Sequence, residues 1–261
     1  MTLNHKNYYS PEANKEYMSV SQLKSFMKCE AAAMAELRGE YTRPTTTALL
    51  VGSFVDAWFE GDTSFRAFQQ EHPEIFKRDG SLKADYVQAA RIIQRVGEDK
   101  LFMDYMSGAK QVIRIGEVYG VPFKIKMDSY FPGEKIVDLK CMRTMEPIMG
   151  KNFVEHWGYD IQGAIYREVE GNGLPFYLAV ATKEEATDLE VLSIPHEHLN
   201  QVMWDLKPKI ERAALVKSGK VKPERCGVCP YCRKTKVLTE PIDFEFAGLS
   251  NDEIKARKGE W

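Results

Sequence analysis

Hydrophobic and polar positions follow a helical pattern through the first hundred residues. Residues 19–37 are rich in Ala, Met, Leu, Glu and Lys and begin with Ser-Val-Ser, which predicts a helix opened by a serine cap. Further helices are predicted over residues 48–60, which Gly61 ends, and over residues 84–105, after a polar connection. We therefore expect this first part of the chain to be mainly helical.

From residue 111 onward, short runs of β-branched and aromatic residues replace the helical pattern. Three such runs, separated by Gly120 and by Pro132-Gly133, predict strands at residues 111–119, 121–131 and 135–141. Tight turns between them should give an antiparallel meander. Four more elements are predicted, namely a helix over 153–170, strands near 176–182 and 190–194, and a long helix over 196–218.

The order of these elements predicts an α/β fold in which helices flank one central sheet. We expect a single elaborated domain over residues 1–261, with a mainly helical part (1–110), an α/β core (111–218) and a cysteine-containing segment (219–261). The charged tail from about residue 239 is expected to dock loosely or to fray.

The composition is typical of a folded globular chain, with 44% hydrophobic and 28% charged residues. No run approaches the roughly 20 apolar residues of a membrane helix, so no membrane partner is expected. The first residues also lack the apolar core of a secretion signal. We therefore expect a cytoplasmic protein, whose five cysteines are better explained by a metal than by disulfides.

The formal charge of −2 provides no general attraction to a phosphate backbone. A nucleic-acid ligand would therefore depend on local basic patches and on a metal site. One patch has only Glu211 and Glu224 against ten basic residues, which are Lys207, Lys209, Arg212, Lys217, Lys220, Lys222, Arg225, Arg233, Lys234 and Lys236. An ordinary solvated surface explains such a run equally well.

Two predicted neighbouring strands contain the main candidate site. Asp128 lies near the end of the second strand, and Asp138 and Lys140 lie on the third. Side chains alternate along a strand, so Asp138 and Lys140 project from one face while Leu139 points to the other. The plain alternative is an edge strand with solvent-facing charge, but Ile136 and Val137 before Asp138 favour a buried strand. Carboxylates from two adjoining strands would suit magnesium or manganese.

Three other polar residues stand in positions where an ordinary surface role is also possible. Gln162 and Tyr166 are four residues apart on a predicted helix and so share one face. Asp56 lies among Phe54, Val55, Ala57 and Trp58, where an unpaired charge would be costly. A bound metal ion would offset the cost of burying the Asp56 charge. Alternatively, Asp56 could lie on the solvent-facing side of the helix, where no metal would be needed.

Taken in order, these residues resemble a known family. Gly52-x-x-Val55-Asp56, Asp128, Asp138-x-Lys140 and Gln162-x-x-x-Tyr166 look like the motif series of the RecB-type branch of PD-(D/E)XK nucleases, especially phage exonucleases similar to RecE and lambda exonuclease. The resemblance covers roughly residues 19–218. It implies the restriction endonuclease-like fold, with a central mixed sheet flanked by helices.

The resemblance also implies a role for each matched position on the strands. Asp128 and Asp138 would bind the metal, with the Leu139 carbonyl as a further ligand, and Lys140 would orient or activate the attacking water. Two departures from the common pattern are Met127 in place of Pro before Asp128, and Asp in place of Glu at position 138. Both occur in this branch.

The helical positions have implied roles as well. Asp56 would contribute to a second ion, where relatives have His or Glu. Gln162 and Tyr166 would line the site and position the scissile phosphate or the lysine. Ser19 and Ser21 look like part of the opening motif of the family, and a hydroxyl with free amide groups at a helix start could contact a DNA phosphate. Plain helix capping explains these two serines equally well.

A second candidate site consists of cysteines. Cys226, Cys229 and Cys232 are spaced C-x2-C-x2-C, and Cys29 in the first predicted helix could supply a fourth thiolate. This set resembles RecB-type nucleases such as AddB, which implies a [4Fe-4S] cluster. Zinc and free thiols remain alternatives, and Cys141 is expected to be ordinary core.

The predicted function is that of a metal-dependent exodeoxyribonuclease, with Mg²⁺ or Mn²⁺ at two ion sites. The resemblance implies 5′ to 3′ degradation of one strand from the ends of linear double-stranded DNA, a homo-oligomeric ring, a single-strand annealing partner protein and the cytoplasm of a bacterial host cell. Two alternatives stay open: a structure-specific or restriction-like DNA endonuclease, and a non-catalytic DNA-binding scaffold with a structural cysteine cluster.

Overall fold

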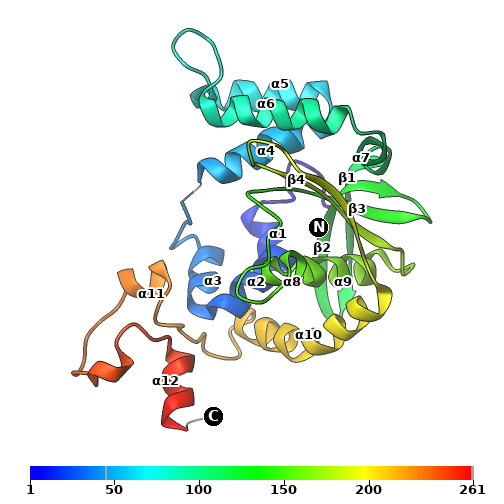
Figure 1. Cartoon of the computed structure of the whole chain (residues 1–261). Coiled ribbons are helices and arrows are strands. Elements are labelled where there is room, and N and C mark those ends of the chain that lie inside the picture. The colour runs from blue at the N-terminus through cyan, green and yellow to red at the C-terminus, as the bar shows by residue number, and fades with distance from the viewer. Residues whose placement is uncertain (45, 260–261) are drawn as a thin grey trace. The chain divides into compact units, whose positions relative to one another are not determined.

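The computed structural model describes residues 1–44 and 46–259 (Figure 1). The chain divides into two compact units. One, here named the sheet unit, comprises Pro44–Val118 and Lys124–Trp204. The other, the cysteine unit, comprises Met1–Arg43, Tyr119–Phe123 and Asp205–Trp261. We describe each unit by itself.

The sheet has five strands in the order β1-β2-β3-β4-β5. Their bounds are Ala109–Val118, Val121–Phe131, Lys135–Met142, Phe176–Thr182 and Leu189–Ile194. β2 pairs antiparallel with β3, β3 parallel with β4, and β4 antiparallel with β5. The predicted α/β fold with a mixed central sheet is therefore confirmed. The one parallel pair requires a crossover connection, and the helices α8 and α9 lie in it.

Helices cover both faces of the sheet within the sheet unit (Figure 1). Their bounds are Thr47–Glu60 (α4), Asp62–Glu71 (α5), Ala84–Gly97 (α6), Lys100–Tyr105 (α7), Phe153–Trp157 (α8) and Tyr159–Glu170 (α9), with a short 3-10 helix at Pro73–Ile75 (η1). The helix α10, His196–Lys217, continues from this unit into the cysteine unit.

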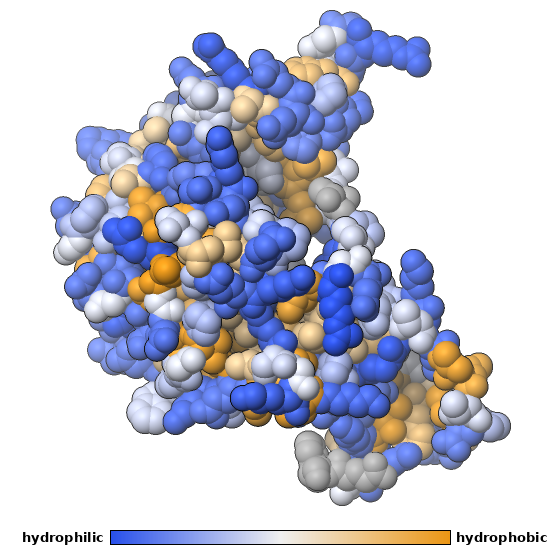
Figure 2. All heavy atoms as spheres, turned by 180° about the vertical axis from the view of Figure 1, so that it is seen from behind, coloured by the Kyte–Doolittle hydropathy of each residue, from blue (hydrophilic) through white to orange (hydrophobic). Residues whose placement is uncertain are grey.

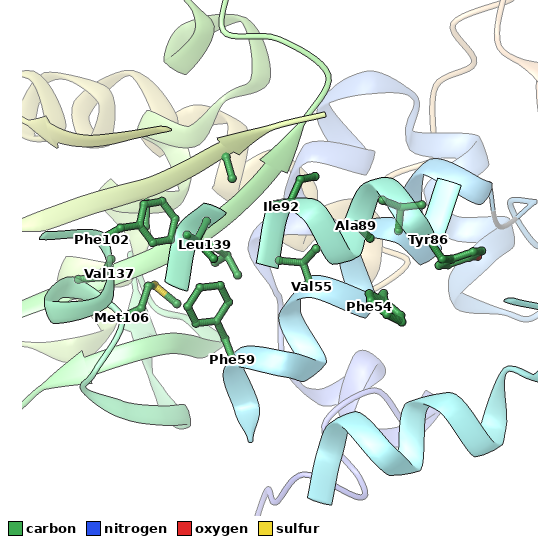
Figure 3. Packing of buried hydrophobic residues seen from close by; sticks show 14 of the residues in the cluster. Phe54, Val55, Phe59, Tyr86, Ala89, Ile92, Phe102, Met106, Val137 and Leu139 are labelled. Carbon is green, nitrogen blue, oxygen red and sulfur yellow. The ribbon is translucent and has the colours of Figure 1, made fainter. Parts of the chain in front are cut away.

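The main core of the sheet unit lies between β3 and the helices α4, α6 and α7. Val137 and Leu139 are buried there with Phe54, Val55 and Ile92 (Figure 3). Because neighbouring residues on a strand face opposite sides, packing Val137 and Leu139 into this core directs Asp138 and Lys140 to the other face. Hydrophobic alternation on β3 therefore positions the two polar residues.

Three helices predicted as continuous are interrupted in the structure. Residues 19–37 form α2 (Val20–Lys28) and α3 (Glu30–Leu37), with Cys29 between them in extended backbone at φ −168°. Residues 84–105 form α6 and α7, because the Asp99 side chain accepts a hydrogen bond from Phe102 N and starts a new helix. Residues 153–170 are divided at Gly158, whose left-handed φ of 62° ends α8. The local sequence favours helix on both sides of each break.

The polar connection predicted after Gly61 contains a helix that the sequence pattern did not identify. Phe65 and Phe68 of α5 stack against Phe54 at ring distances of 4.9 and 6.0 Å. Tertiary contact with α4 thus stabilises a short helix that is otherwise polar.

The cysteine unit is formed by short helices around α2 and α3. The others are α1 (Pro11–Glu16), α11 (Pro230–Lys234), η2 (Phe244–Phe246) and α12 (Asn251–Lys258), together with the end of α10. The charged tail forms α12, which a capping box between Ser250 and Glu253 begins. Asn251 N donates to Cys226 O at 2.9 Å, so this tail is attached to the cysteine segment.

The surface drawn in Figure 2 is mainly hydrophilic, with hydrophobic residues in small separate areas. None of the helices in residues 1–44 and 46–259 has the length and apolar character needed to cross a membrane.

Candidate active site

The structure joins the three predicted strand residues in one hydrogen-bonded group. Asp138 is 2% exposed and forms an ion pair with Lys140 on the same strand. Asp128 on β2 accepts a hydrogen bond at 2.9 Å from the backbone N–H of Leu139, which lies between them. Two carboxylates and one ammonium therefore meet on one face of β2 and β3.

The helix α9 adds the first residue of the predicted pair to this group. Gln162 Nε2 donates to Asp138 Oδ1 at 2.5 Å, which fixes the orientation of the buried carboxylate. Tyr166 instead donates from its hydroxyl to the Lys126 carbonyl of β2 at 3.1 Å. Tyr166 thus fastens α9 to the strand that contains Asp128.

Asp56 on α4 is electrostatically linked to the same group. Its pKa is raised to about 7, chiefly because burial disfavours the charge, and the nearby Asp138 carboxylate adds to the rise. Lys140 acts in the opposite direction and lowers the pKa of Asp56. Asp56 is therefore not a freely solvated residue on a wet helix face.

The other two charged groups have shifted pKa values for related reasons. Burial, and then repulsion by Asp138 and Asp56, raise the pKa of Asp128 well above its usual range. Burial opposes the charge on Lys140, but Asp138 and Asp128 outweigh it and raise the lysine pKa. Lys140 therefore keeps its positive charge in a site that contains three aspartates.

Two residues that the sequence reasoning did not identify also belong to the site. The Tyr159 ring lies 4.9 Å from Lys140 Nζ, and burial raises the pKa of Tyr159 to about 12. Gln111 is 8% exposed, has a left-handed φ of 52°, and donates from Nε2 to Asp128 Oδ1 at 3.2 Å. Tyr159 stands three residues before Gln162, so the two share one face of the helix, and this spacing could have identified Tyr159 from the sequence. Nothing in the local sequence singles out Gln111.

The donor set of this group fits a hard divalent cation. Asp56, Asp128 and Asp138 present carboxylate oxygens, the ligand type that magnesium and manganese prefer. Gln111 Oε1 is buried with no hydrogen-bond partner among the residues that the structure describes, so it offers one more oxygen. Lys140 supplies the counter-charge to Asp138.

The four predicted cysteines converge in the cysteine unit. The Sγ atoms of Cys29, Cys226, Cys229 and Cys232 all lie within 4.8 Å of one another. Within residues 1–44 and 46–259, no other cluster of three or more His, Cys, Asp or Glu ligand atoms is this compact. The break between α2 and α3 places Cys29 here, and its Sγ lies 3.6 Å from that of Cys232.

Backbone amides around this cluster already point at sulfur. Cys229 N donates to Cys226 Sγ at 3.3 Å, and Cys232 N donates to Cys229 Sγ at 3.4 Å. Although burial opposes ionisation, the backbone N–H groups of Cys229 and Val228 lower the pKa of Cys226 to about 7. Burial raises the pKa of Cys232 to about 12. All four are free thiols suited to a tetrahedral metal or an iron-sulfur cluster.

The two serines and the basic patch, which the sequence indicated as candidate DNA contacts, form hydrogen bonds within the cysteine unit. Ser19 caps α2 by accepting from Gln22 N at 3.2 Å, and its hydroxyl lies 3.0 Å from that of Ser21. In the basic patch, Arg212 forms two hydrogen bonds with Glu30, at 2.8 and 2.9 Å. Lys217 donates to Gln22 Oε1 at 2.8 Å. Part of the basic patch therefore holds this unit together.

A comparison with known protein families shows which family this chain matches. Residues 19–235 match the family described as "PDDEXK-like domain of unknown function (DUF3799)". The chain belongs to this PDDEXK-like family. The matched range includes the sheet, every residue of the acidic site and all four clustered cysteines. Membership of the PD-(D/E)XK group, which the motif series implied, is thereby confirmed.

Two solved structures are similar to this PDDEXK-like chain. The first is a crystal structure of a "Putative exonuclease" from Eubacterium rectale, 44% identical, with a TM-score of 0.89 over 95% of this chain and all of the other. The second, the crystal structure of SSO0001, is 13% identical with a TM-score of 0.30, covering 85% of this chain and 96% of the other, and it supports no conclusion. No curated protein matches the chain.

Proposed function

We propose that this PDDEXK-like protein is a divalent-metal-dependent deoxyribonuclease that hydrolyses phosphodiester bonds at the acidic site. The observation that supports this most directly is the linked group of Asp128, Asp138, Lys140 and Gln162. Carboxylates on two adjoining strands can hold divalent ions, and a lysine beside them can assist metal-dependent hydrolysis of a phosphodiester.

Asp128, Asp138 and the Leu139 carbonyl are the proposed ligands of one magnesium or manganese ion, and Asp56 is proposed to contribute to a second. Bound divalent ions would supply Lewis acidity and a more acidic water. Gln162 keeps the Asp138 carboxylate in a fixed orientation through its 2.5 Å hydrogen bond. Gln111 of β1 orients the Asp128 carboxylate in a similar way, through its 3.2 Å hydrogen bond.

Lys140 has a narrower role in this proposal than general base. In the metal-free site its two acidic neighbours raise its pKa, so the amine is protonated there and is a hydrogen-bond donor rather than an acceptor. It can donate a hydrogen bond to an attacking water or to a phosphate oxygen. We therefore assign Lys140 to orienting the nucleophile and stabilising negative charge on the phosphate.

An exonuclease acting on the ends of linear double-stranded DNA is the specific form that we favour. It is supported by the 44% identity to the protein described as a "Putative exonuclease", across nearly the whole of both chains. Degradation of one strand from 5′ to 3′, a homo-oligomeric ring and cooperation with a single-strand annealing protein in recombination are proposed from the resemblance to phage enzymes. A ring would reconcile the net charge of −2 with DNA binding, since only its channel needs lysine and arginine.

For the cysteine cluster we propose a [4Fe-4S] cofactor, with zinc as the alternative. The support is four mutually close sulfurs from two distant parts of the chain. Joining Cys29 to the segment of residues 226–232 would tie the first helices to the C-terminal part of the cysteine unit, which is a structural role.

Digestion of end-labelled linear duplex, with and without magnesium, tests the proposed activity. We expect magnesium-dependent release of label from linear DNA and no loss of closed circles, whereas digestion of closed circles would indicate an endonuclease. Asp138→Ala should lower the rate at least ~100-fold, because it removes a ligand rather than a supporting contact.

Asp160→Asn is the matched control for this experiment. Asp160 is also a buried carboxylate of α9, but its two oxygens face other partners, His198 Nε2 at 3.3 Å and the backbone N–H of Ile161 at 2.8 Å. We expect it to keep the activity. Degradation that survives Asp138→Ala unchanged would instead support a non-catalytic DNA-binding scaffold contaminated by another nuclease.

A further inference from the structure

A cavity of about 310 Å³ lies between α9 and the first turns of α10, within the sheet unit. Its wall includes Arg167 and Glu168 of α9, Asn200 of α10, and Gly173 of the loop that follows α9. Arg167 stands five residues after Gln162, which is about 140° around a helix of 3.6 residues per turn. The cavity therefore lies on a different side of α9 from Gln162, the residue that contacts the acidic site.

Arg167 is the cationic side chain of this wall, and its hydrogen bonds leave most of its guanidinium unused. Nη1 donates to Asn200 Oδ1, and Nη2 lies beside His196 Nδ1, both at 3.3 Å. Nε is buried and has no hydrogen-bond partner among the residues that the structure describes. A guanidinium has five N–H donors, so two contacts with side chains that accept only when uncharged satisfy a minority of them.

The carboxylates of α9 do not neutralise this charge. Asp160 faces His198 Nε2 and its neighbouring backbone N–H, and Glu170 accepts a hydrogen bond from the Tyr130 hydroxyl at 2.8 Å. Glu168 is exposed, and within residues 1–44 and 46–259 the guanidinium of Arg167 forms no ion pair with it. Because a half-buried charge without a partner is costly, an anion from outside the chain would complete this site.

The ordinary role of an arginine at a helix end does not account for Arg167. Such side chains commonly bind the last carbonyls of their own helix, but the guanidinium of Arg167 is directed to side chains of α10. Gly173 leaves the guanidinium uncovered, since the first carbon of a side chain there would lie 3.8 Å from Nη2. Arg95, in the last turn of α6, differs because its Nη1 lies 3.9 Å from the Asp99 carboxylate.

We propose that this cavity binds the phosphate group of a nucleotide, with Arg167 as the main contact. The choice of phosphate rests on the nuclease activity proposed above, because that reaction consumes phosphodiesters and releases phosphorylated products. A guanidinium matches phosphate through two parallel hydrogen bonds. The volume of about 310 Å³ is at the lower end of the roughly 300–1,000 Å³ of small-molecule pockets, which leaves room for a sugar. A released mononucleotide and the backbone of bound DNA share this chemistry.

Calorimetric titration of the full chain with thymidine 5′-monophosphate, without added magnesium, tests the site. Under these conditions the acidic site repels phosphate, so it does not contribute to binding. We expect Arg167→Met to weaken binding at least ~10-fold, because a paired contact between charged groups is lost. Arg167→Lys keeps the charge without the paired geometry and should bind with intermediate affinity. Inorganic phosphate should compete with the nucleotide, whereas thymidine should not.

Gly173→Asn and Arg95→Met are the companion variants. Asparagine tolerates the left-handed φ of 66° at position 173, and its side chain would cover the guanidinium. Binding should therefore fall although Arg167 is still present. Arg95→Met removes another arginine from the last turn of a helix in the same unit and should leave binding unchanged. Equal weakening by Arg167→Met and Arg95→Met, or no binding of the monophosphate to the unaltered protein, overturns the proposal.

An oligothymidine without a terminal phosphate separates the two sources. If it binds more tightly than the monophosphate and Arg167→Met weakens it equally, the cavity holds the DNA backbone. If only the monophosphate depends on Arg167, the cavity holds a released nucleotide. Binding that is independent of Arg167 for both ligands overturns the site. Because no hydrolysis is required, a protein that binds phosphate at Arg167 but digests no DNA would refute the proposed function and leave this site intact.

Discussion

The acidic site of the sheet unit and the cysteine cluster of the cysteine unit each bring several potential metal ligands together. They differ in how the charges of those ligands are balanced. In the cluster, four sulfur atoms lie within 4.8 Å of one another with no counter-charge among them. In the acidic site, by contrast, Lys140 forms an ion pair with Asp138. Most thiols are neutral at pH 7 and pack like small apolar groups, whereas ionised carboxylates repel one another.

This difference indicates how each site responds to a metal. The cluster is already arranged for its ion, so binding should add stability to an existing geometry. In the acidic site, burial chiefly, and then repulsion between the carboxylates, raise the pKa values of Asp56 and Asp128, so negative charge there is costly. Binding of a divalent cation should relieve that repulsion. Three perturbations would break or sharpen this comparison.

Cys232→Ser should have the largest effect, on the cysteine unit alone. Cys232 is 1% exposed and its Sγ lies 3.6 Å from that of Cys29, so its loss removes a ligand and leaves a buried hydroxyl. We expect loss of bound iron or zinc and a fall in stability of several kcal/mol, as for structural metal sites. Metal analysis, visible absorbance of anaerobically purified protein and urea unfolding measure these effects.

Cys141→Ser is the matched control for this change. Cys141 lies on β3 outside the cluster, with its pKa raised to about 11 by burial. It should leave the metal content unchanged. Full retention of metal by Cys232→Ser would show that the four sulfurs do not act together.

Lys140→Met should destabilise the metal-free sheet unit by ~3–5 kcal/mol, because it leaves buried carboxylates without a counter-charge. Added magnesium should restore part of this stability, since a cation replaces the missing ammonium. Urea unfolding with and without magnesium is the measurement. Lys124→Met is the control: Lys124 is also buried on the sheet, with its pKa lowered to about 8 by burial, so its loss should not create a new magnesium dependence. Equal magnesium effects in both variants would contradict the comparison.

The smallest effect is expected in the pH dependence of magnesium binding. Asp56 has a folded-state pKa of about 7, above its usual 3.8. Its ionisation therefore costs stability in the metal-free protein as pH rises from about 4 through 7, and a bound cation removes that cost. Magnesium affinity should accordingly fall as pH drops through 7, by up to ~10-fold per pH unit for one competing proton.

Calorimetric titration of magnesium at several pH values measures this dependence. Asp56→Asn should bind more weakly with a flatter pH profile, because its side chain does not titrate. An unchanged slope in Asp56→Asn would assign the competing proton to another acid, with Asp128 as the next candidate.

The sheet and the acidic residues on it were largely predictable from the sequence. The β4 run was predicted at the residues it occupies, and β3 ends within one residue of its predicted end. Alternation of Val137 and Leu139 with Asp138 and Lys140 was enough to place two polar groups on one face, because the side-chain period of a strand does not depend on its neighbours. The expectation of one domain across the whole chain stays a prediction.

The breaks in the helices could not be predicted in the same way. Cys29 stands in a stretch of good helix formers, and only the position of the distant cysteine segment explains why the helix is interrupted there. Gln111 is similar, since its left-handed backbone and its hydrogen bond to Asp128 depend on how β1 lies beside β2.

The sequence by itself therefore determined the residue types, the strand faces and the family motif series, since these follow from local periodicity and spacing. Only the tertiary structure decided that Gln162 holds Asp138, that Asp56 interacts electrostatically with Asp138, and that Cys29 joins three cysteines about two hundred residues away. The physical reason is that burial and charge interactions depend on distance in space, which pattern along a chain does not specify.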